Sequence, residues 1–153
     1  MAREDFFCRL SALSKQLGID LQEVQLQQFY SYYTLLVEKN KVMNLTAITE
    51  EDDVIVKHFI DSLAMAKLNV SRETFSNWIE GKRCMDVGTG AGFPGLAIKI
   101  AFPSISLSLS DSLQKRIHFL EEVVQKLELK GVDFHHGRAE DLGKKPELRE
   151  QYD

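Results

Sequence analysis

A glycine-rich run between two apolar stretches is the first part of this sequence that could do chemistry. Residues 86–96 read DVGTGAGFPGL, with four glycines and one proline. Ligands gather where a parallel strand ends and a helix begins, because backbone N–H groups point outward there. Glycines let such a ligand lie against bare main chain. The run predicts a site for phosphates or a nucleoside cofactor, with a ligand-free tight turn as the alternative.

Two patterns fit this run. Gly90, Gly92 and Gly95 match the G-x-G-x-x-G signature of dinucleotide sites. The second pattern is an acid that leaves the strand and a glycine at every second residue: Asp86, Gly88, Gly90 and Gly92. An acid here would repel a pyrophosphate by about 1 kcal/mol or more, whereas it favours the sulfonium and ammonium groups of S-adenosylmethionine. We therefore predict that Asp86, Gly90 and Gly92 bind S-adenosylmethionine, and an NAD-dependent oxidoreductase stays open as the alternative.

A second carboxylate supports a nucleoside ligand under either pattern. Asp111 ends the next predicted strand, where a carboxylate can accept the protons of both ribose hydroxyls. Its other role is to cap the following helix together with Ser112, and the two roles are compatible. After the third predicted strand, Ala139 could offer a backbone N–H and Glu140 an acceptor to the adenine end of such a cofactor, with a merely solvated acidic loop as the alternative.

The elements that must position these residues change in character near residue 80. Before it, helices are predicted to end at Gly18, to begin at Asp20 with Glu23 completing a capping box, and to begin again at Thr49. Their predicted buried stripes are Phe6, Leu10, Leu13 and Leu17; Phe29, Tyr33 and Leu36; and Ile55, Phe59, Ile60 and Leu63.

After Gly81 the pattern alternates between strands and helices. The predicted strands are 84–87, 104–110 and 132–135, and the predicted helices are 94–102 and 113–129. In the last helix, the residues predicted to face inward are Ile117, Leu120, Val124 and Leu127. Such alternation implies a parallel sheet. The predicted fold class is α/β, with residues 1–80 as a helical N-terminal extension.

Composition sets the broad class. The chain has 153 residues, 44% of them hydrophobic and 27% charged, which is enough for one compact unit without a metal or disulfide. Cys8 and Cys84 lie far apart, as in proteins of a reducing compartment. The tandem His135 and His136 lack a metal-ligand spacing, so no metal site is expected. No stretch approaches the roughly 20 apolar residues of a membrane span, and a cytoplasmic location is expected.

The sequence resembles bacterial small-subunit ribosomal RNA guanine-N7 methyltransferases of the glucose-inhibited division protein B type. The segments that carry the resemblance are NLTAI at 44–48, KHFIDSL at 57–63, DVGTGAGFPGLAIKI at 86–100, DSLQKRIHFLEEV at 111–123 and GRAEDL at 137–142. The resemblance implies a class I methyltransferase with a Rossmann-like sheet, S-adenosylmethionine as cofactor and residues 81–153 as the N-terminal part of its binding domain. The positions that match the family's cofactor contacts are Gly88, Phe93, Asp111, Ser112, Leu113, Ala139 and Glu140.

The chemistry that the resemblance implies needs no catalytic base. Guanine N7 carries an in-plane lone pair and no proton, so positioning and desolvation are sufficient for in-line methyl transfer. We therefore predict no catalytic residue. His58 and Asp61 share one helical face, and an ion pair between them or a contact with the substrate is favoured over a proton relay. Together with Asn44 they are predicted to contact RNA.

Charge limits how the chain would hold RNA. A net charge of -4 argues against a protein that coats nucleic acid by charge alone. It does not exclude a local basic rim, on which we place Lys115 and Arg116, with scattered solubilising charges as the alternative. Positive charge is mildly unfavourable in the first turn of a helix, which favours a functional role over simple solvation of that helix.

The resemblance also exposes a difference in length. Family members continue past Asp153 into a strand that pairs with the first strand of the sheet, so residues 84–87 are expected to form an open edge. A cofactor-binding module without activity is therefore the remaining alternative.

Overall fold

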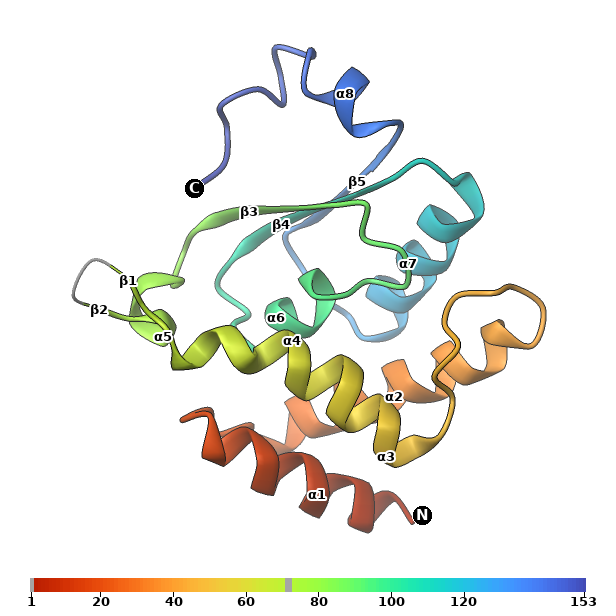
Figure 1. The fold of residues 1–153 in the computed structure, drawn as a ribbon, viewed down its shortest axis with the longest axis vertical. Helices are drawn as coiled ribbons and strands as arrows, with labels where there is room; N and C mark the ends of the chain where they lie inside the picture. The colour runs from red at the N-terminus through yellow and green to blue at the C-terminus, as the bar shows by residue number, and fades with distance from the viewer. Residues whose placement is uncertain (1, 71–72) are drawn as a thin grey trace.

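The computed structural model describes residues 2–70 and 73–153, and its layers are visible in Figure 1. A central sheet is covered on one face by two helices and, beyond them, by the N-terminal helical region. The C-terminal segment lies on the other face.

The N-terminal region is almost entirely helical. Its elements are α1 (Arg3–Gln16), α2 (Glu23–Asn40), α3 (Glu51–Val54), the π-helix η1 (Ile55–Ile60), α4 (Asp61–Leu63) and the 3-10 helix η2 (Ala64–Lys67). The antiparallel strands β1 (Asn69–Val70) and β2 (Glu73–Thr74) and the short helix α5 (Phe75–Trp78) follow. No helix within residues 2–70 and 73–153 is long and apolar enough to cross a membrane.

The second half of the chain confirms the predicted alternation. The parallel strands β3 (Arg83–Val87), β4 (Ser106–Asp111) and β5 (Val132–His136) lie in the order β3-β4-β5. The helices between and after them are α6 (Gly95–Ala101), α7 (Gln114–Lys126) and α8 (Ala139–Leu142). The register pairs Val87 with Ser110 and Asp111 with His136, so the carboxyl ends of all three strands meet at one edge. The α/β fold with a parallel sheet is therefore as predicted.

One apolar core joins the two halves of the chain. Both α6 and α7 pack against α2. Phe29 and Leu36 of α2 are fully buried in the same cluster as Leu96 of α6 and Leu120 of α7. The division at residue 80 stays a prediction about domains, because the packing itself is continuous across it.

Several predicted helix starts were wrong by a few residues. The second helix begins at Glu23, and its capping box joins Gln22 and Gln25 rather than Asp20 and Glu23. Ile19 and Leu21 are buried, which keeps the residues before Gln22 in an irregular segment that inserts into the core. A local capping pattern does not record such long-range burial.

The third helix begins at Glu51 rather than at Thr49, and it contains the π-helix η1. The wider π turns rotate the residues that follow, and Ile60 is only partly buried. Four other predicted core residues are also only partly buried: Leu13, Leu17, Tyr33 and Val124. Tyr32 and Val123, next to the last two, are fully buried.

β3 lies at the edge of the three-stranded sheet, as expected. On its outer side the Asp153 N–H donates to the Arg83 carbonyl at 2.7 Å, and the Arg83 N–H donates to Asp153 Oδ2 at 2.8 Å. No described strand pairs with the rest of this edge.

Candidate functional site

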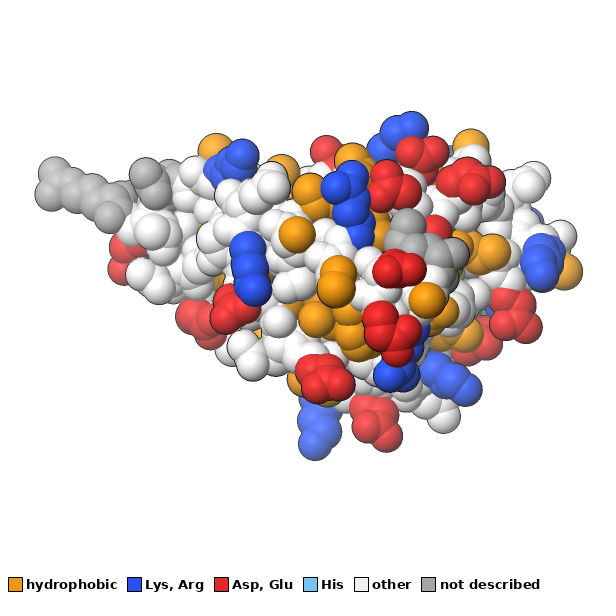
Figure 2. Space-filling view, turned by 90° about the horizontal axis from the view of Figure 1, so that it is seen from below, with side chains coloured by type: hydrophobic (Ala, Val, Ile, Leu, Met, Phe, Trp, Pro, Cys, Tyr) orange, Lys and Arg blue, Asp and Glu red, His pale blue; other side chains and the backbone are white. Residues whose placement is uncertain are grey.

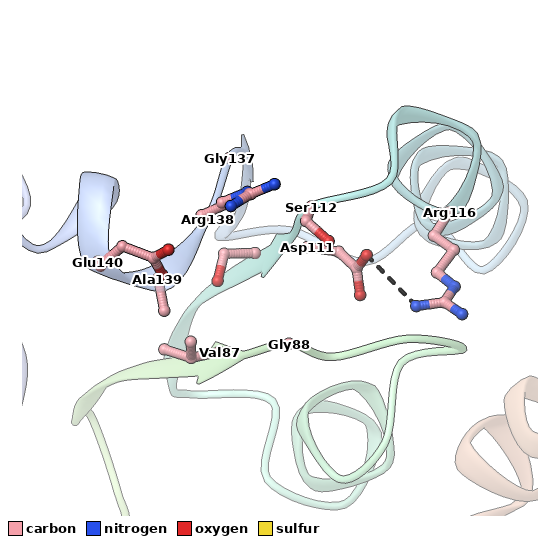
Figure 3. A pocket seen from close by; sticks show the side chains of 10 residues that line it. Val87, Gly88, Asp111, Ser112, Arg116, Gly137, Arg138, Ala139 and Glu140 are labelled. Carbon is pink, nitrogen blue, oxygen red and sulfur yellow. Dashed lines mark ion pairs between the residues drawn. The ribbon is translucent and has the colours of Figure 1, made fainter.

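A pocket of about 440 Å³ opens at the carboxyl ends of the three strands (Figure 3). We call it the strand-end pocket. It is lined by Val87 and Gly88, by Ser110, Asp111 and Ser112, by Arg116 of α7, and by Gly137, Arg138, Ala139 and Glu140. Its size is within the usual range of small-molecule sites. Three of the segments singled out in the sequence thus meet in one place.

Asp111 lies at the floor of this pocket and is only 4% exposed. Its Oδ2 accepts the Gly90 N–H at 2.9 Å, and its Oδ1 accepts the Leu113 N–H, also at 2.9 Å. Arg116 Nη1 lies 3.5 Å from Oδ1, an ion pair that Figure 3 marks. These donors orient the carboxylate and join the glycine run to the start of α7. A role at the helix start and a role toward a ligand are compatible here.

The residues between β3 and α6, 88–94, form what we call the glycine loop. Gly88 has φ +69° and lines the strand-end pocket, and a Cβ added to it would meet no atom within 4 Å, so its main chain is open to a ligand. Gly92 is different, because it is buried and faces α2. A Cβ there would meet the Tyr32 hydroxyl and lie 2.8 Å from Leu96 Cδ1. Packing alone therefore requires Gly92, although it is absent from the pocket lining.

Asp86 holds the glycine loop from the strand side. Its Oδ2 accepts the Thr89 hydroxyl at 2.7 Å and the Gly95 N–H at 2.9 Å. Asp86 lines a separate, apolar pocket of about 250 Å³ beside Trp78 and Met65, outside the strand-end pocket. The structure thus gives Asp86 a positioning role, and direct contact with a cofactor stays a prediction.

Replacing Asp86 with asparagine tests this positioning role. Burial raises the pKa of Asp86 above its usual value, with its hydrogen bonds to Thr89 and Gly95 opposing that shift. A raised folded-state pKa favours the protonated form, so its contribution to stability is present at low pH and is lost as the pH rises through the folded-state pKa. Asparagine keeps an acceptor oxygen without the charge. We expect Asp86→Asn to unfold at an equal or higher denaturant midpoint at pH 7, with less loss of stability between pH 4 and 7.

Asp86→Ala is the matched control, because it removes both the charge and the acceptor. It should lower the free energy of unfolding at every pH, since the Gly95 N–H and Thr89 hydroxyl lose their partner. Equal destabilisation by asparagine and alanine would contradict the positioning role.

Comparison with known proteins assigns the chain to a family. The family model described as rRNA small subunit methyltransferase G matches residues 25–153. The chain belongs to this family. The resemblance inferred from the five sequence segments is therefore confirmed.

Individual relatives agree with the family match. The ribosomal RNA small subunit methyltransferase G of Leuconostoc mesenteroides is 48% identical over 157 aligned residues, covering 100% of this chain and 60% of the relative. The proteins of the same name from Lachnoclostridium phytofermentans and Leuconostoc citreum are 50% and 51% identical, and the chain covers 54% and 58% of their lengths. The chain thus spans little more than half the length of these members of the methyltransferase G family.

Several residues expected to bind the cofactor of a methyltransferase G protein line the strand-end pocket: Gly88, Asp111, Ser112, Ala139 and Glu140. Leu113 is 41% exposed beside it and contributes its backbone N–H to Asp111. Phe93 is absent from the lining, and its ring lies against Tyr32 and His58 instead.

The residues predicted to contact RNA do not form one cluster. His58 stacks on Phe93 and shares a 2.8 Å hydrogen bond between Nε2 and Thr46 Oγ1. Burial lowers the pKa of His58, and the nearby charge of Asp61 opposes that shift. Asp61 and Asn44 are exposed. Among the described residues no ion pair joins His58 to Asp61, and His58 contacts Thr46 and Phe93 instead. The other favoured role, a contact with the substrate, stays a prediction.

The two basic residues predicted on the RNA rim separate in the structure. Lys115 is exposed on the first turn of α7, whereas Arg116 turns toward Asp111 and lines the strand-end pocket (Figure 3). The sequence analysis missed this role of Arg116. The available signal was helical spacing. Arg116 comes three residues after Leu113, the residue that precedes α7, so the two lie on the same face of the helix.

Tyr32 is the other residue that the sequence analysis missed. It is fully buried, and its hydroxyl donates to the Ala91 carbonyl of the glycine loop at 2.5 Å. Helical spacing from Phe29 fits Tyr32 and Tyr33 equally well, so the pattern alone did not separate them.

The cysteines and the possible metal ligands were also predicted from the sequence. Cys8 is an exposed free thiol and Cys84 a half-buried one. Within residues 2–70 and 73–153, no group of three or more His, Cys, Asp or Glu side chains is arranged to hold a metal ion.

Proposed function

We propose that the strand-end pocket binds S-adenosylmethionine and that the whole protein methylates guanine N7 in small-subunit ribosomal RNA, in the cytoplasm. The observation that carries the proposal is the buried Asp111 carboxylate at the end of β4, facing a pocket that the bare Gly88 main chain also lines. Ala139 and Glu140 lie across the same pocket, where the adenine end of a nucleoside would be flanked.

The start of α6 favours this cofactor over a dinucleotide. A pyrophosphate usually accepts from the backbone N–H groups at the first turn of the helix after the glycines. In this chain the Gly95 N–H already donates to Asp86, so a carboxylate stands where a phosphate would accept. The same negative charge is compatible with a ligand that carries a sulfonium and an ammonium. This arrangement argues against the NAD-dependent alternative.

A titration separates the two cofactors. We expect S-adenosylmethionine, or its demethylated product, to bind the chain at least about fivefold more tightly than NAD, because Asp86 would repel the pyrophosphate of the dinucleotide by about 1 kcal/mol or more. Isothermal titration calorimetry of both ligands at one pH and salt concentration measures the difference. Tighter binding of NAD would overturn the methyltransferase proposal.

The methyl transfer requires positioning from this chain rather than proton chemistry. Bound S-adenosylmethionine would supply a methyl group on its sulfonium, and guanine N7 has no proton to lose. The chain's residues would orient the cofactor and exclude water from the pocket, and we assign no catalytic base. Asn44, His58 and Asp61 are proposed as RNA contacts on the N-terminal region, since His58 packs directly on the glycine loop.

The face formed around α1 is a poor candidate for binding RNA. Figure 2 shows acidic and basic side chains interspersed there, without a patch of one sign. RNA recognition at a net charge of -4 therefore depends on a limited number of cations near the pocket. Lys115 is the exposed cation that we place there.

Separate substitutions of Lys115 and Arg116 test this assignment. In the full-length enzyme, Lys115→Ala should weaken binding to small-subunit ribosomal RNA and reduce the slope of log affinity against log salt by about 0.7 to 0.9 for each phosphate that is no longer neutralised. Its cofactor affinity should stay unchanged. Arg116→Ala should alter cofactor affinity, because it removes the ion pair with Asp111. Lys126→Ala, at the opposite end of α7, is the matched control and should change neither.

The same preparation tests the substrate directly. Small ribosomal subunits or their RNA, incubated with a labelled methyl donor, should acquire label at guanine N7. Methylation of a small metabolite or a protein, with none at guanine N7, would overturn the substrate proposal while leaving the cofactor proposal intact.

A further inference from the structure

Three aromatic rings connect the N-terminal region to the glycine loop. Phe93 of the loop stacks on Tyr32 of α2, with centroids 5.3 Å apart and planes 15° apart. It also stacks on His58 of η1, at 4.3 Å and 3°. Residues from three separate segments thus form one set of near-parallel rings.

Tyr32 also holds the loop by a hydrogen bond. Its hydroxyl donates to the Ala91 carbonyl at 2.5 Å, inside the buried core. Burial raises the pKa of Tyr32 well above its usual value, with the charge of Asp86 acting in the same direction, so the hydroxyl keeps its proton. The close approach at Gly92 leaves no space between the loop and this side chain. The loop main chain therefore rests directly on α2.

His58 is held at the other end of the ring set. Its Nε2 lies 2.8 Å from Thr46 Oγ1, which also accepts the Ile48 N–H at 3.0 Å. Asn40 at the end of α2 accepts the Thr46 N–H through its side-chain oxygen at 3.0 Å. Residues 44–48, which the cofactor pocket does not use, thus belong to the same network.

The π-helix places His58 in this network. Six residues, Ile55–Ile60, form η1 between α3 and α4. π-helical turns are rare and occur frequently at functional sites. Within η1, Phe59 is fully buried, and its ring centroid lies 5.8 Å from that of Phe93. His58 stacks on the same Phe93 ring.

We propose that Tyr32 and His58 are positioning residues that hold the glycine loop in the shape that binds the cofactor. The N-terminal helical region is then part of the cofactor site, although none of its residues lines the strand-end pocket. The expected effect of Tyr32 and His58 on cofactor affinity rests on the proposed S-adenosylmethionine site. Their expected effect on the structure of the glycine loop does not depend on that site.

The loop transmits this support to the pocket through its own hydrogen bonds. The Gly92 N–H and the Phe93 N–H both donate to the Thr89 carbonyl, at 3.0 and 3.3 Å. One residue after Thr89, the Gly90 N–H donates to Asp111 at the pocket floor. A loop that leaves the rings for part of the time would bind ligand only in the remaining fraction of molecules. Its apparent dissociation constant would rise by the reciprocal of that fraction.

Four variants of the 153-residue chain test the proposal. Tyr32→Phe keeps the ring and removes the hydroxyl, whereas His58→Ala removes a ring and His58→Phe restores one. Tyr33→Phe is the matched control, because Tyr33 is the next residue of α2 and contacts Phe6 and Tyr30 instead of the loop. The measurements are amide hydrogen exchange without ligand and calorimetric titration with S-adenosylmethionine.

We expect Tyr32→Phe and His58→Ala to speed exchange of the Gly92 and Phe93 amides by about tenfold, with the amides of α1 unchanged as a measure of global stability. The dissociation constant for S-adenosylmethionine should rise by a similar factor, and His58→Phe should restore both values. Tyr33→Phe should behave as wild type. Phenylalanine has no ring nitrogen that could bond to Thr46, so recovery in His58→Phe would assign the role of His58 to stacking.

Three results would overturn the proposal. The loop amides could exchange as in wild type, the loop could loosen without any change in affinity, or α1 and the loop could lose protection together. If the wild-type chain does not bind S-adenosylmethionine, the cofactor proposal fails, and the exchange of the loop amides still decides whether the rings hold the loop.

Discussion

Replacing Gly92 with alanine should lower the free energy of unfolding by about 3 kcal/mol, the sum of backbone strain and overpacking. Gly92 has φ +104°, which side-chain-bearing residues rarely adopt. A Cβ would also meet the Tyr32 hydroxyl, with Leu96 Cδ1 at 2.8 Å and Leu120 Cδ2 at 3.0 Å. These atoms belong to three helices of the core, so the loop rather than the helices must move. Urea unfolding followed by circular dichroism measures the change.

Gly18→Ala is the control for backbone strain alone. Gly18 has φ +78°, and a Cβ there meets no atom within 4 Å. We expect it to cost about 1 kcal/mol. If both substitutions destabilise the chain equally, the close packing of the loop against α2 does not contribute, and Gly92 is required for its backbone angle only.

Replacing Asp111 with alanine should weaken binding of S-adenosylmethionine by about 1 to 3 kcal/mol, or roughly 5- to 150-fold. The substitution removes the carboxylate proposed to accept the ribose hydroxyls. It also leaves the Gly90 and Leu113 N–H groups without their acceptor and Arg116 without its ion pair. Calorimetric titration measures the affinity, and chemical unfolding of the same sample measures the accompanying loss of stability.

A matched control separates a local effect from a change in overall charge. Asp133→Ala removes one exposed carboxylate from β5, outside the strand-end pocket, and should leave the affinity unchanged. An unchanged affinity in Asp111→Ala, with stability reduced, would limit Asp111 to orienting the start of α7.

The N-terminal region is more than an appended extension, because it shares its apolar core with the sheet and its helices. Phe29 and Leu36 of α2 are buried in the same core as α6 and α7, and Tyr32 reaches the glycine loop. A protein cut near residue 80 would therefore expose the apolar faces of α6 and α7 and release the glycine loop, which precedes α6.

The sequence by itself determined the secondary structure of the second half and the place of the site. Short apolar stretches predicted the three strands, and their alternation with helices predicted that they are parallel. The glycine run and Asp111 predicted where a ligand would bind, because strand ends and glycines act through local backbone geometry. Gly88, Asp111, Ala139 and Glu140 were found from the residues themselves, the family resemblance added Ser112, and all five line one pocket. The family followed from five short segments, since their combination is more specific than the glycine run alone.

Only the tertiary structure decided which side chains support that site. Asp86 turns to the Gly95 N–H, Arg116 turns to Asp111, and Tyr32 rather than Tyr33 enters the core. Each outcome depends on a partner far away in the chain or on a rotation within one helical turn, and residue spacing records neither. The π-helix had the same effect on His58, because a local widening of the helix set the direction of its ring toward Phe93. Burial and long-range contacts, which exist only after folding, therefore assigned the positioning roles that periodicity left open.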